Sequence, residues 1–192
     1  MKELKVENVI ISKQLENSEN YQKFLEIVKK KKVKVKTVQV GERIQIEKNL
    51  YIDILWPDMS NSINDNILNN NAIVCKLTYN SFSMLFTGDV EEIAEKAILE
   101  RYKDNLNILK ASVLKIAHHG SSTSSIEEFL KAVRPQIGLI GVGENNNFGH
   151  PSDITLENLE AISCKTFRTD KDGKISIGVN REGRIKIRKF LN

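Results

Sequence analysis

The strand, helix and strand pattern within residues 82–125 constrains the fold of this chain more than any other feature. Apolar runs at residues 83–86 and 113–116 flank an acidic segment, residues 91–101. The apolar side chains of that segment recur at helical spacing. A helix between two strands over this distance predicts a crossover that joins parallel strands. The carboxyl ends of both strands should therefore meet at one edge of a sheet.

Candidate metal ligands follow both of these strands. Asp89 comes after the first strand, and His118 and His119 come after the second. Ligand sites in such sheets lie at the carboxyl ends of the strands, and a carboxylate beside imidazoles suits zinc, manganese or iron. Asp89 could instead only cap the helix that follows it, because the next residues are acidic. Adjacent histidines are harder to explain structurally, because buried imidazoles need polar partners.

Length and composition fit one compact domain. The 192 residues are 40% hydrophobic, and we expect residues 1–192 to form a single domain with a sizeable core. The net charge of +4 permits a polyanionic partner without requiring one. With neither a signal-peptide pattern nor a membrane-spanning run in the sequence, we predict a soluble, cytoplasmic chain. Cys75 and Cys164 lack metal-finger spacing and are interpreted as small core residues.

The first third of the sequence predicts a strand, a helix and several short strands. The strand covers residues 4–11, and Asn17 or Ser18 caps the helix. Apolar and polar residues alternate from residue 33 to residue 56, as in antiparallel strands with one wet face. The lysines of residues 29–36 suit the end of a helix and a solvated face, and they could also contact phosphates.

An asparagine-rich segment, residues 60–71, predicts a loop. Its last residues, Asn70 and Asn71, precede a strand at residues 72–79. Asn80-Ser81 forms a hairpin from that strand into the one that ends before Asp89. Asn71 is therefore a candidate for supporting the site or contacting substrate, and the alternative is a surface segment without function.

Two later segments bring further polar groups to the same edge. The turn of residues 120–125 leads into a helix at 126–133, where hydroxyls and free amides can bind an anion, although one serine is expected to act only as a cap. A strand at residues 137–142 is followed by a glycine- and asparagine-rich loop that carries His150. His150 could instead cap the helix at 153–162. Strands at 164–168, 174–179 and 184–190, with turns at 170–173 and 180–183, complete the chain.

These motifs together resemble the metallo-β-lactamase superfamily, and within it the hydrolase domain of the competence protein ComEC and its stand-alone relatives. The matching segments are Asn70-Asn71-Ala72-Ile73-Val74, residues 85–91 (LFTGDVE), residues 113–124 (VLKIAHHGSSTS) and Gly149-His150-Pro151. The resemblance implies an α/β/β/α sandwich with a mixed sheet, of which this chain would be the carboxyl-terminal part. It also implies phosphodiester hydrolysis, with DNA as the expected substrate.

The resemblance implies roles for individual residues. Asp89 resembles the aspartate that bridges the metal ions, and His119, or its neighbour His118, resembles the later histidine ligand. His150 would bind the scissile phosphate or orient substrate, together with the turn that contains Gly120, Ser121, Ser122 and Ser124. The implied cofactor is a divalent metal ion, zinc or manganese, which lowers the pKa of a bound water and stabilises charge on a phosphoryl oxygen.

One part of the family pattern does not occur in this sequence. No His-x-His-x-Asp-His motif precedes Asp89, and the first histidine is His118. Catalytic zinc usually has three protein ligands, so we expect the chain alone to bind metal weakly. Three interpretations stay open: half of a hydrolase completed by a separate amino-terminal half, a non-catalytic module that binds nucleic acid or is structural, and a degenerate gene fragment.

Overall fold

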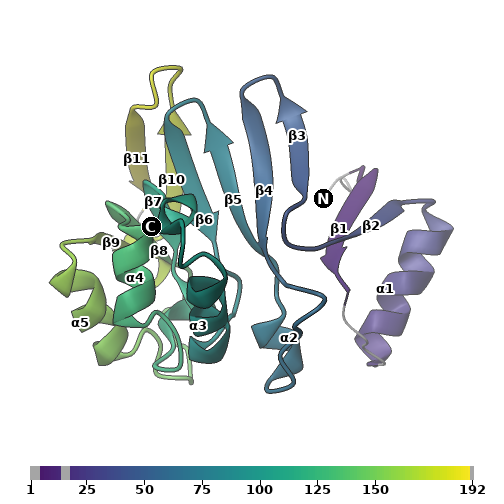
Figure 1. The fold of residues 1–192 in the computed structure, drawn as a ribbon, viewed down its shortest axis with the longest axis horizontal. Coiled ribbons are helices and arrows are strands. Elements are labelled where there is room, and N and C mark those ends of the chain that lie inside the picture. The colour runs from purple at the N-terminus through teal and green to yellow at the C-terminus, as the bar shows by residue number, and fades with distance from the viewer. Residues whose placement is uncertain (1–4, 14–17, 191–192) are drawn as a thin grey trace.

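In a computed structural model, which describes residues 5–13 and 18–190, the chain forms an α/β fold around a seven-stranded mixed sheet (Figure 1). In sheet order the strands are β3 (Arg43–Glu47), β4 (Leu50–Trp56), β5 (Val74–Tyr79), β6 (Phe82–Phe86), β7 (Val113–Lys115), β8 (Ile137–Ile140) and β9 (Lys165–Arg168). The strands from β3 to β6 pair antiparallel, and those from β6 to β9 pair parallel. The predicted α/β class and mixed sheet are confirmed.

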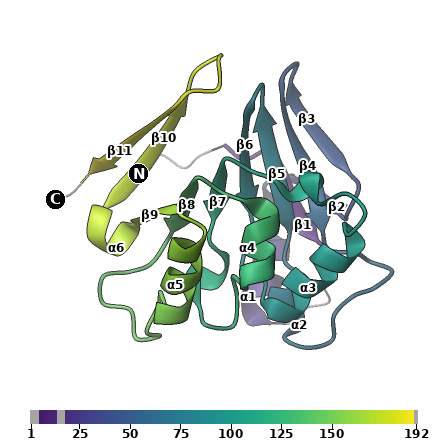
Figure 2. The same cartoon turned by 60° about the vertical axis from the view of Figure 1, so that its left-hand side comes forward.

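The parallel half of the sheet is built from crossovers. Helix α3 (Glu92–Arg101) connects β6 to β7, α4 (Glu127–Val133) connects β7 to β8, and α5 (Asp153–Ala161) connects β8 to β9. These three helices lie over one face of the sheet (Figure 2). The predicted crossover from residue 83 to residue 116 is therefore confirmed, and the carboxyl ends of β6, β7 and β8 lie side by side.

The hydrophobic core lies between these helices and the sheet. Leu85, Leu114 and Ile140 of the strands pack in one cluster with Ile98 of α3 and Leu130 of α4, and all five are at most 1% exposed. Burying a side chain of this size contributes about 1.5–3 kcal/mol. Cys164 also belongs to the cluster, as predicted for a small core residue, while Cys75 is partly buried; both thiols are free.

The amino-terminal region forms a small separate sheet. Strand β1 (Asn8–Ser12) pairs parallel with β2 (Lys34–Val38), and α1 (Glu19–Lys30) connects them. Antiparallel pairing for residues 33–38 is therefore wrong, because the alternation of side chains gives a strand's exposed face and says nothing of its direction. Ser18 caps α1 by accepting from the Tyr21 amide. Leu4 and Asn17, which the predictions included, lie outside the described residues.

The remaining elements are short. Strands β10 (Lys174–Val179) and β11 (Ile185–Phe190) match the two predicted strands, and they pair antiparallel to form a second two-stranded sheet. The predicted turn at residues 170–173 is a one-turn helix, α6 (Thr169–Asp172), in which Asp172 accepts from the Arg168 amide. The asparagine-rich loop ends in α2 (Ile67–Asn70), and 3-10 turns lie at Leu106–Leu109 and Ala117–Gly120. No helix in the described ranges is long and apolar enough to cross a membrane.

Candidate functional site

Hydrogen bonds between the ends of β6 and β7 join the two loops that carry Asp89 and the histidine pair. The Thr87 hydroxyl donates to the carbonyl oxygen of Lys115 (2.7 Å), and the His118 amide donates to the carbonyl oxygen of Gly88 (3.0 Å). These bonds extend the parallel pairing of the strands by several residues. They place Asp89 next to the His118-His119 pair, as the sequence predicts.

The ring of His119 is oriented by the neighbouring strand. Its Nδ1 lies 2.6 Å from the carbonyl oxygen of Gly141, which follows β8. Because a carbonyl oxygen only accepts, this contact selects the tautomer with the proton on Nδ1, in which Nε2 presents its lone pair. That Nε2 lies 3.8 Å from Oδ1 of Asp89, and both side chains are about half exposed. Two electron-pair donors therefore face each other at the surface of the molecule.

His118 faces a different acid. Its Nδ1 is buried and has no hydrogen-bond partner in the part of the chain that the structure describes. Oε1 of Glu91 lies 3.5 Å from this atom. Asn70 holds Glu91 in place, because its side chain accepts from the Glu91 amide (3.0 Å) and donates to Oε2 (3.2 Å). Sequence reasoning treated Glu91 only as an acid of the following helix, although it lies in the LFTGDVE segment.

The backbone that carries the histidine pair is strained. His118 (φ 45°), His119 (φ 56°) and Gly120 (φ 82°) are three successive residues in the left-handed region. This region costs a residue with a side chain about 1–2 kcal/mol, and such residues cluster at functional sites. The turn directs one imidazole toward Glu91 and the other toward Asp89.

His150 completes the group of histidines. Its ring centroid lies 5.8 Å from that of His118, and it stacks on Phe148 at 5.9 Å. Burial is the main effect that lowers the pKa of His150 from its usual value of 6.5, and the nearby rings of His118 and His119 act in the same direction, which favours the neutral ring near pH 7. Asp89 and all three histidines are thus brought to one edge of the sheet, as predicted.

Comparison with known proteins places this arrangement in context. The chain is 30% identical over 188 residues to ComE operon protein 3 of Bacillus subtilis. The matched region covers 97% of the chain and 23% of that protein. It is 31% identical over 142 residues to competence protein ComA of Neisseria gonorrhoeae, covering 72% of the chain and 20% of the relative. These similarities point to the ComEC-related competence proteins. No family model matches the sequence.

The relatives are much longer than the region of similarity. The chain spans about a fifth of the length of each of these two competence proteins. Recombination protein 2 of Haemophilus influenzae is also similar, at 28% identity over 109 residues, or 57% of the chain and 13% of the relative. The similarity to competence proteins therefore concerns one portion of each relative.

Several residues that the sequence indicated as site residues form hydrogen bonds within their own loops. The Asn71 side chain bonds to the backbone of Ile63 and Ile67 and so closes the asparagine-rich loop. Ser124 is buried and donates to carbonyl oxygens at positions 117 and 121. Ser121 is also buried and bonds to Thr123. The roles of these residues toward a substrate stay predictions.

The exposed part of the serine turn lies beside acidic side chains. Ser122 and Thr123 line a cavity of about 480 Å³ together with Asp65, Glu91 and Glu92. The Thr123 hydroxyl donates to Glu91 at 3.3 Å. Lys96 also lines this cavity and pairs with Glu92. The carboxylates still outnumber the cations there, so the cavity is poorly suited to an anion.

The donor set fits part of a metal centre. Asp89 and His119 offer the donor types that zinc and manganese accept, and His118 has an unpartnered ring nitrogen. Among residues 5–13 and 18–190, however, no three histidine, cysteine or acidic side chains are grouped closely enough to hold a metal ion. The described residues thus provide two well-placed donors and lack a complete coordination sphere.

Proposed function

We propose that this chain supplies part of the metal centre of a phosphodiester hydrolase linked to DNA uptake. The observation that carries the proposal is the pair of electron-pair donors, His119 Nε2 and Asp89 Oδ1, which face each other at 3.8 Å. A proton or a metal ion between them would relieve the repulsion of the two lone pairs. The names of the competence relatives support the link to DNA uptake.

Each side chain of the site would have its own role in the proposed metal centre. Asp89 and His119 would hold a divalent metal ion, zinc or manganese. His118, which faces Glu91 in this structure, would have to turn toward Asp89 to serve as a further ligand. When bound, such an ion supplies a water of lowered pKa and stabilises negative charge on a phosphoryl oxygen. The Gly141 carbonyl fixes the tautomer of His119. His150, which is neutral near pH 7, would donate a hydrogen bond to the scissile phosphate, and Gly120 and Ser122 are candidates for further contacts.

The remaining ligands would come from another polypeptide segment. The metallo-β-lactamase pattern, which the motifs resemble, takes most of its ligands from a His-x-His-x-Asp-His loop. A separate amino-terminal half with that loop is therefore the partner that we propose, and DNA is the proposed substrate. Metal binding by this chain alone should be weak, because catalytic zinc usually has three protein ligands.

Histidine ring NMR in the 192-residue chain tests the metal site directly. In the absence of metal, the ¹⁵N spectrum should show His119 protonated on Nδ1, and zinc should shift its Nε2 resonance. Asp89→Ala should abolish that shift, whereas Asp104→Ala, at an exposed acid outside the site, should leave it unchanged. A zinc-induced shift of equal size in Asp89→Ala would refute the role of Asp89.

Reconstitution tests the activity. Adding a polypeptide that carries the His-x-His-x-Asp-His loop should produce manganese- or zinc-dependent cleavage of DNA, and Asp89→Ala should remove it. Cleavage that survives Asp89→Ala would place the chemistry elsewhere.

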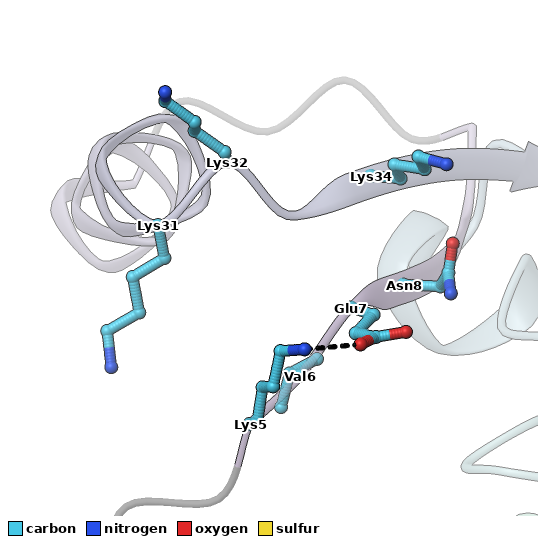
Figure 3. Close-up of a pocket in the computed structure, with 7 residues that line it drawn as sticks. All are labelled: Lys5, Val6, Glu7, Asn8, Lys31, Lys32 and Lys34. Atoms are coloured by element: carbon cyan, nitrogen blue, oxygen red, sulfur yellow. Dashed lines mark hydrogen bonds and ion pairs between the residues drawn. The ribbon is translucent and has the colours of Figure 1, made fainter.

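A second candidate, a nucleic-acid-binding module without catalysis, is favoured by the lysines at the end of α1. Lys5, Lys31, Lys32 and Lys34 line a cavity of about 570 Å³ together with Glu7 (Figure 3). Lys5 pairs with Glu7 at 2.7 Å, and Lys31 and Lys32 point away from each other. The lysines do not converge on one point, which suits sequence-independent attraction to a phosphate backbone.

The dependence of DNA affinity on salt concentration distinguishes this binding module from the proposed hydrolase. With chelator present, the Lys32→Ala/Lys34→Ala double variant should reduce the slope of log affinity against log salt by about one for each lysine. Lys48→Ala, an exposed lysine in the β3–β4 turn, is the control. DNA binding that requires metal, or an unchanged slope in the double variant, would contradict this second function.

A further inference from the structure

Phe148 has an unusual environment for a phenylalanine. Its side chain is 81% exposed, more than any other large apolar side chain in the described residues. One face of the ring stacks on His150, at a centroid distance of 5.9 Å and an interplanar angle of 17°. A single exposed hydrophobic residue is common on protein surfaces. An exposed ring stacked parallel on a residue of the candidate site calls for a more specific explanation.

The loop that carries Phe148 is held by its own hydrogen bonds. The Asn146 side chain donates to the carbonyl oxygens of Gly143 (3.2 Å) and His150 (2.8 Å), and it accepts from the His150 amide (3.0 Å). These three bonds close the loop between residue 143 and residue 150. The backbone that carries Phe148 is therefore held in place before any ligand arrives, which lowers the entropic cost of binding.

Phe148 also lines a cavity next to the proposed metal donors. The cavity, of about 390 Å³, is formed by Phe148, His150 and His119 with Val142, Asn146 and Thr169 among its other lining residues. Its size lies at the lower end of the range for small-molecule sites. Because His119 and His150 belong to both the cavity and the candidate site, a group bound here would lie next to a group that reacts there.

We infer that this cavity is a stacking subsite for one unpaired nucleobase next to the scissile phosphate, with Phe148 as its platform. The inference rests on the proposed function, because the phosphate beside the base is the one that the Asp89 and His119 centre would act on. It adds a substrate class, single-stranded nucleic acid, since a base within a duplex has no free face to stack on an aromatic side chain.

The polar groups of the cavity favour stacking over the recognition of base edges. The Thr169 hydroxyl accepts from the Val142 amide and donates to the Val142 carbonyl oxygen, both at 2.7 Å. The Asn146 side chain is used within its loop, and Gly141 accepts from His119. With these groups engaged, all four bases should bind with similar affinity, because every base has a π face.

Binding of oligonucleotides to the 192-residue chain with chelator present tests this subsite without any cleavage. The probes are a short fluorescent oligothymidine and an abasic oligonucleotide with the same number of phosphates. Phe148→Ala should weaken oligothymidine binding by about 5- to 150-fold, the range for loss of one stacked base, and should not change abasic binding. Phe190→Ala, at another exposed phenylalanine on β11, is the matched control.

A tryptophan variant provides an independent measurement. Phe148→Trp should restore binding, and its fluorescence should be quenched by oligothymidine and not by the abasic probe. The native tryptophan, Trp56, is buried and serves as the background. Three results would each overturn the subsite: no detectable oligothymidine binding by the unmodified chain, equal losses for both probes in Phe148→Ala, or tighter binding of a proline-rich or aromatic peptide than of oligothymidine.

The outcome is separable from that of the metal centre. The zinc-induced shift of His119 should persist in Phe148→Ala. Asp89→Ala, which should abolish that shift, should not weaken oligothymidine binding with chelator, because it removes a negative charge that lies beside the phosphates. Stacking without metal binding would therefore leave this subsite intact and reject the hydrolase, and the converse pattern would reject only the subsite.

Discussion

Two regions of the molecule have the same connectivity and differ in almost every other respect. β1–α1–β2 and β6–α3–β7 are both parallel strands joined by a helix. In α3, Ala94, Glu95 and Ile98 are buried, whereas no residue of α1 is. The first unit belongs to a two-stranded sheet and the second to a seven-stranded one. In Figure 1, α1 lies at the opposite end of the long axis from α5.

The comparison shows that the motif does not determine how much a unit contributes to stability or function. A crossover buries its helix only where enough neighbouring strands form a surface to cover it. The β6–α3–β7 unit has that surface, and the same packing fixes the strand ends that carry Asp89 and the histidine pair. The predictions that follow test this contrast, from the largest expected effect to the smallest.

The same substitution in each unit should give very different losses of stability. Leu114→Ala, on β7 at 1% exposure, should lower the free energy of unfolding by roughly 2–5 kcal/mol, because it removes buried methyl groups and leaves a cavity. Leu25→Ala, on α1 at 39% exposure, should change it by less than about 0.5 kcal/mol. Urea denaturation measures both. Equal losses would show that α1 is packed as firmly as the core.

This difference in burial could be predicted from the sequence only in part. The apolar runs at residues 83–86 and 113–116 indicated buried strands, and the crossover rule gave their parallel pairing. The alternation in residues 33–38 resembled that in residues 43–56, yet β2 pairs parallel and β3 with β4 antiparallel. Pairing partners are set by tertiary packing, which a local pattern of two-residue period does not encode.

Glu95 should make the buried unit sensitive to pH. Burial raises the pKa of this carboxyl from 4.5 to about 7, against the opposing effect of the Ile126 and Ser125 amides that donate to it. The folded state therefore keeps the proton to a higher pH than the unfolded state. Its contribution to stability is greatest below about pH 4.5 and falls by on the order of 3 kcal/mol as the pH rises to about 7.

Replacing the carboxyl with an amide isolates this contribution. Glu95→Gln should flatten the dependence of unfolding free energy on pH between about 4.5 and 7 relative to the unmodified chain. Glu26→Gln, at an exposed position of α1, should leave the curve unchanged and is the control from the other unit. Parallel curves for the unmodified chain and Glu95→Gln would mean that Glu95 does not retain its proton in the folded state.

Alanine substitutions at two glycines should separate the stability cost of backbone strain from the cost of a steric clash. Gly120 and Gly41 both have positive φ, at 82° and 89°. A Cβ at Gly120 would lie 2.6 Å from Cβ of Pro151, whereas one at Gly41 would meet nothing within 4 Å. Both alanine variants should lose about 1–2 kcal/mol from strain. Gly120→Ala should lose about 1–3 kcal/mol more from overpacking. Its histidine ring resonances should also move, because the turn positions both imidazoles.

The sequence indicated the composition of the site better than its orientation. Strand ends and a parallel sheet were enough to bring Asp89 and the three histidines together. The left-handed turn at His118 and His119 decides which acid each ring faces, and the sequence marks it only weakly, because glycine occurs at position 120 and not at the two histidines. The hydrogen bond from Asn70 to Glu91 spans 21 residues and depends on tertiary packing, so the local sequence pattern indicated Asn71 and did not indicate Asn70.

Surface ion pairs should contribute almost equally in both regions, and little in either. Lys23 pairs with Glu19 on α1 and Lys131 pairs with Glu127 on α4, both at i,i+4 spacing and both largely exposed. Lys23→Ala and Lys131→Ala should each lower the free energy of unfolding by at most about 0.5 kcal/mol. A larger effect for Lys131→Ala would mean that charge, and not only burial, distinguishes the two regions. Equal small effects would mean that the two regions differ in stability because of apolar packing. The geometry of the candidate site depends on the same packing.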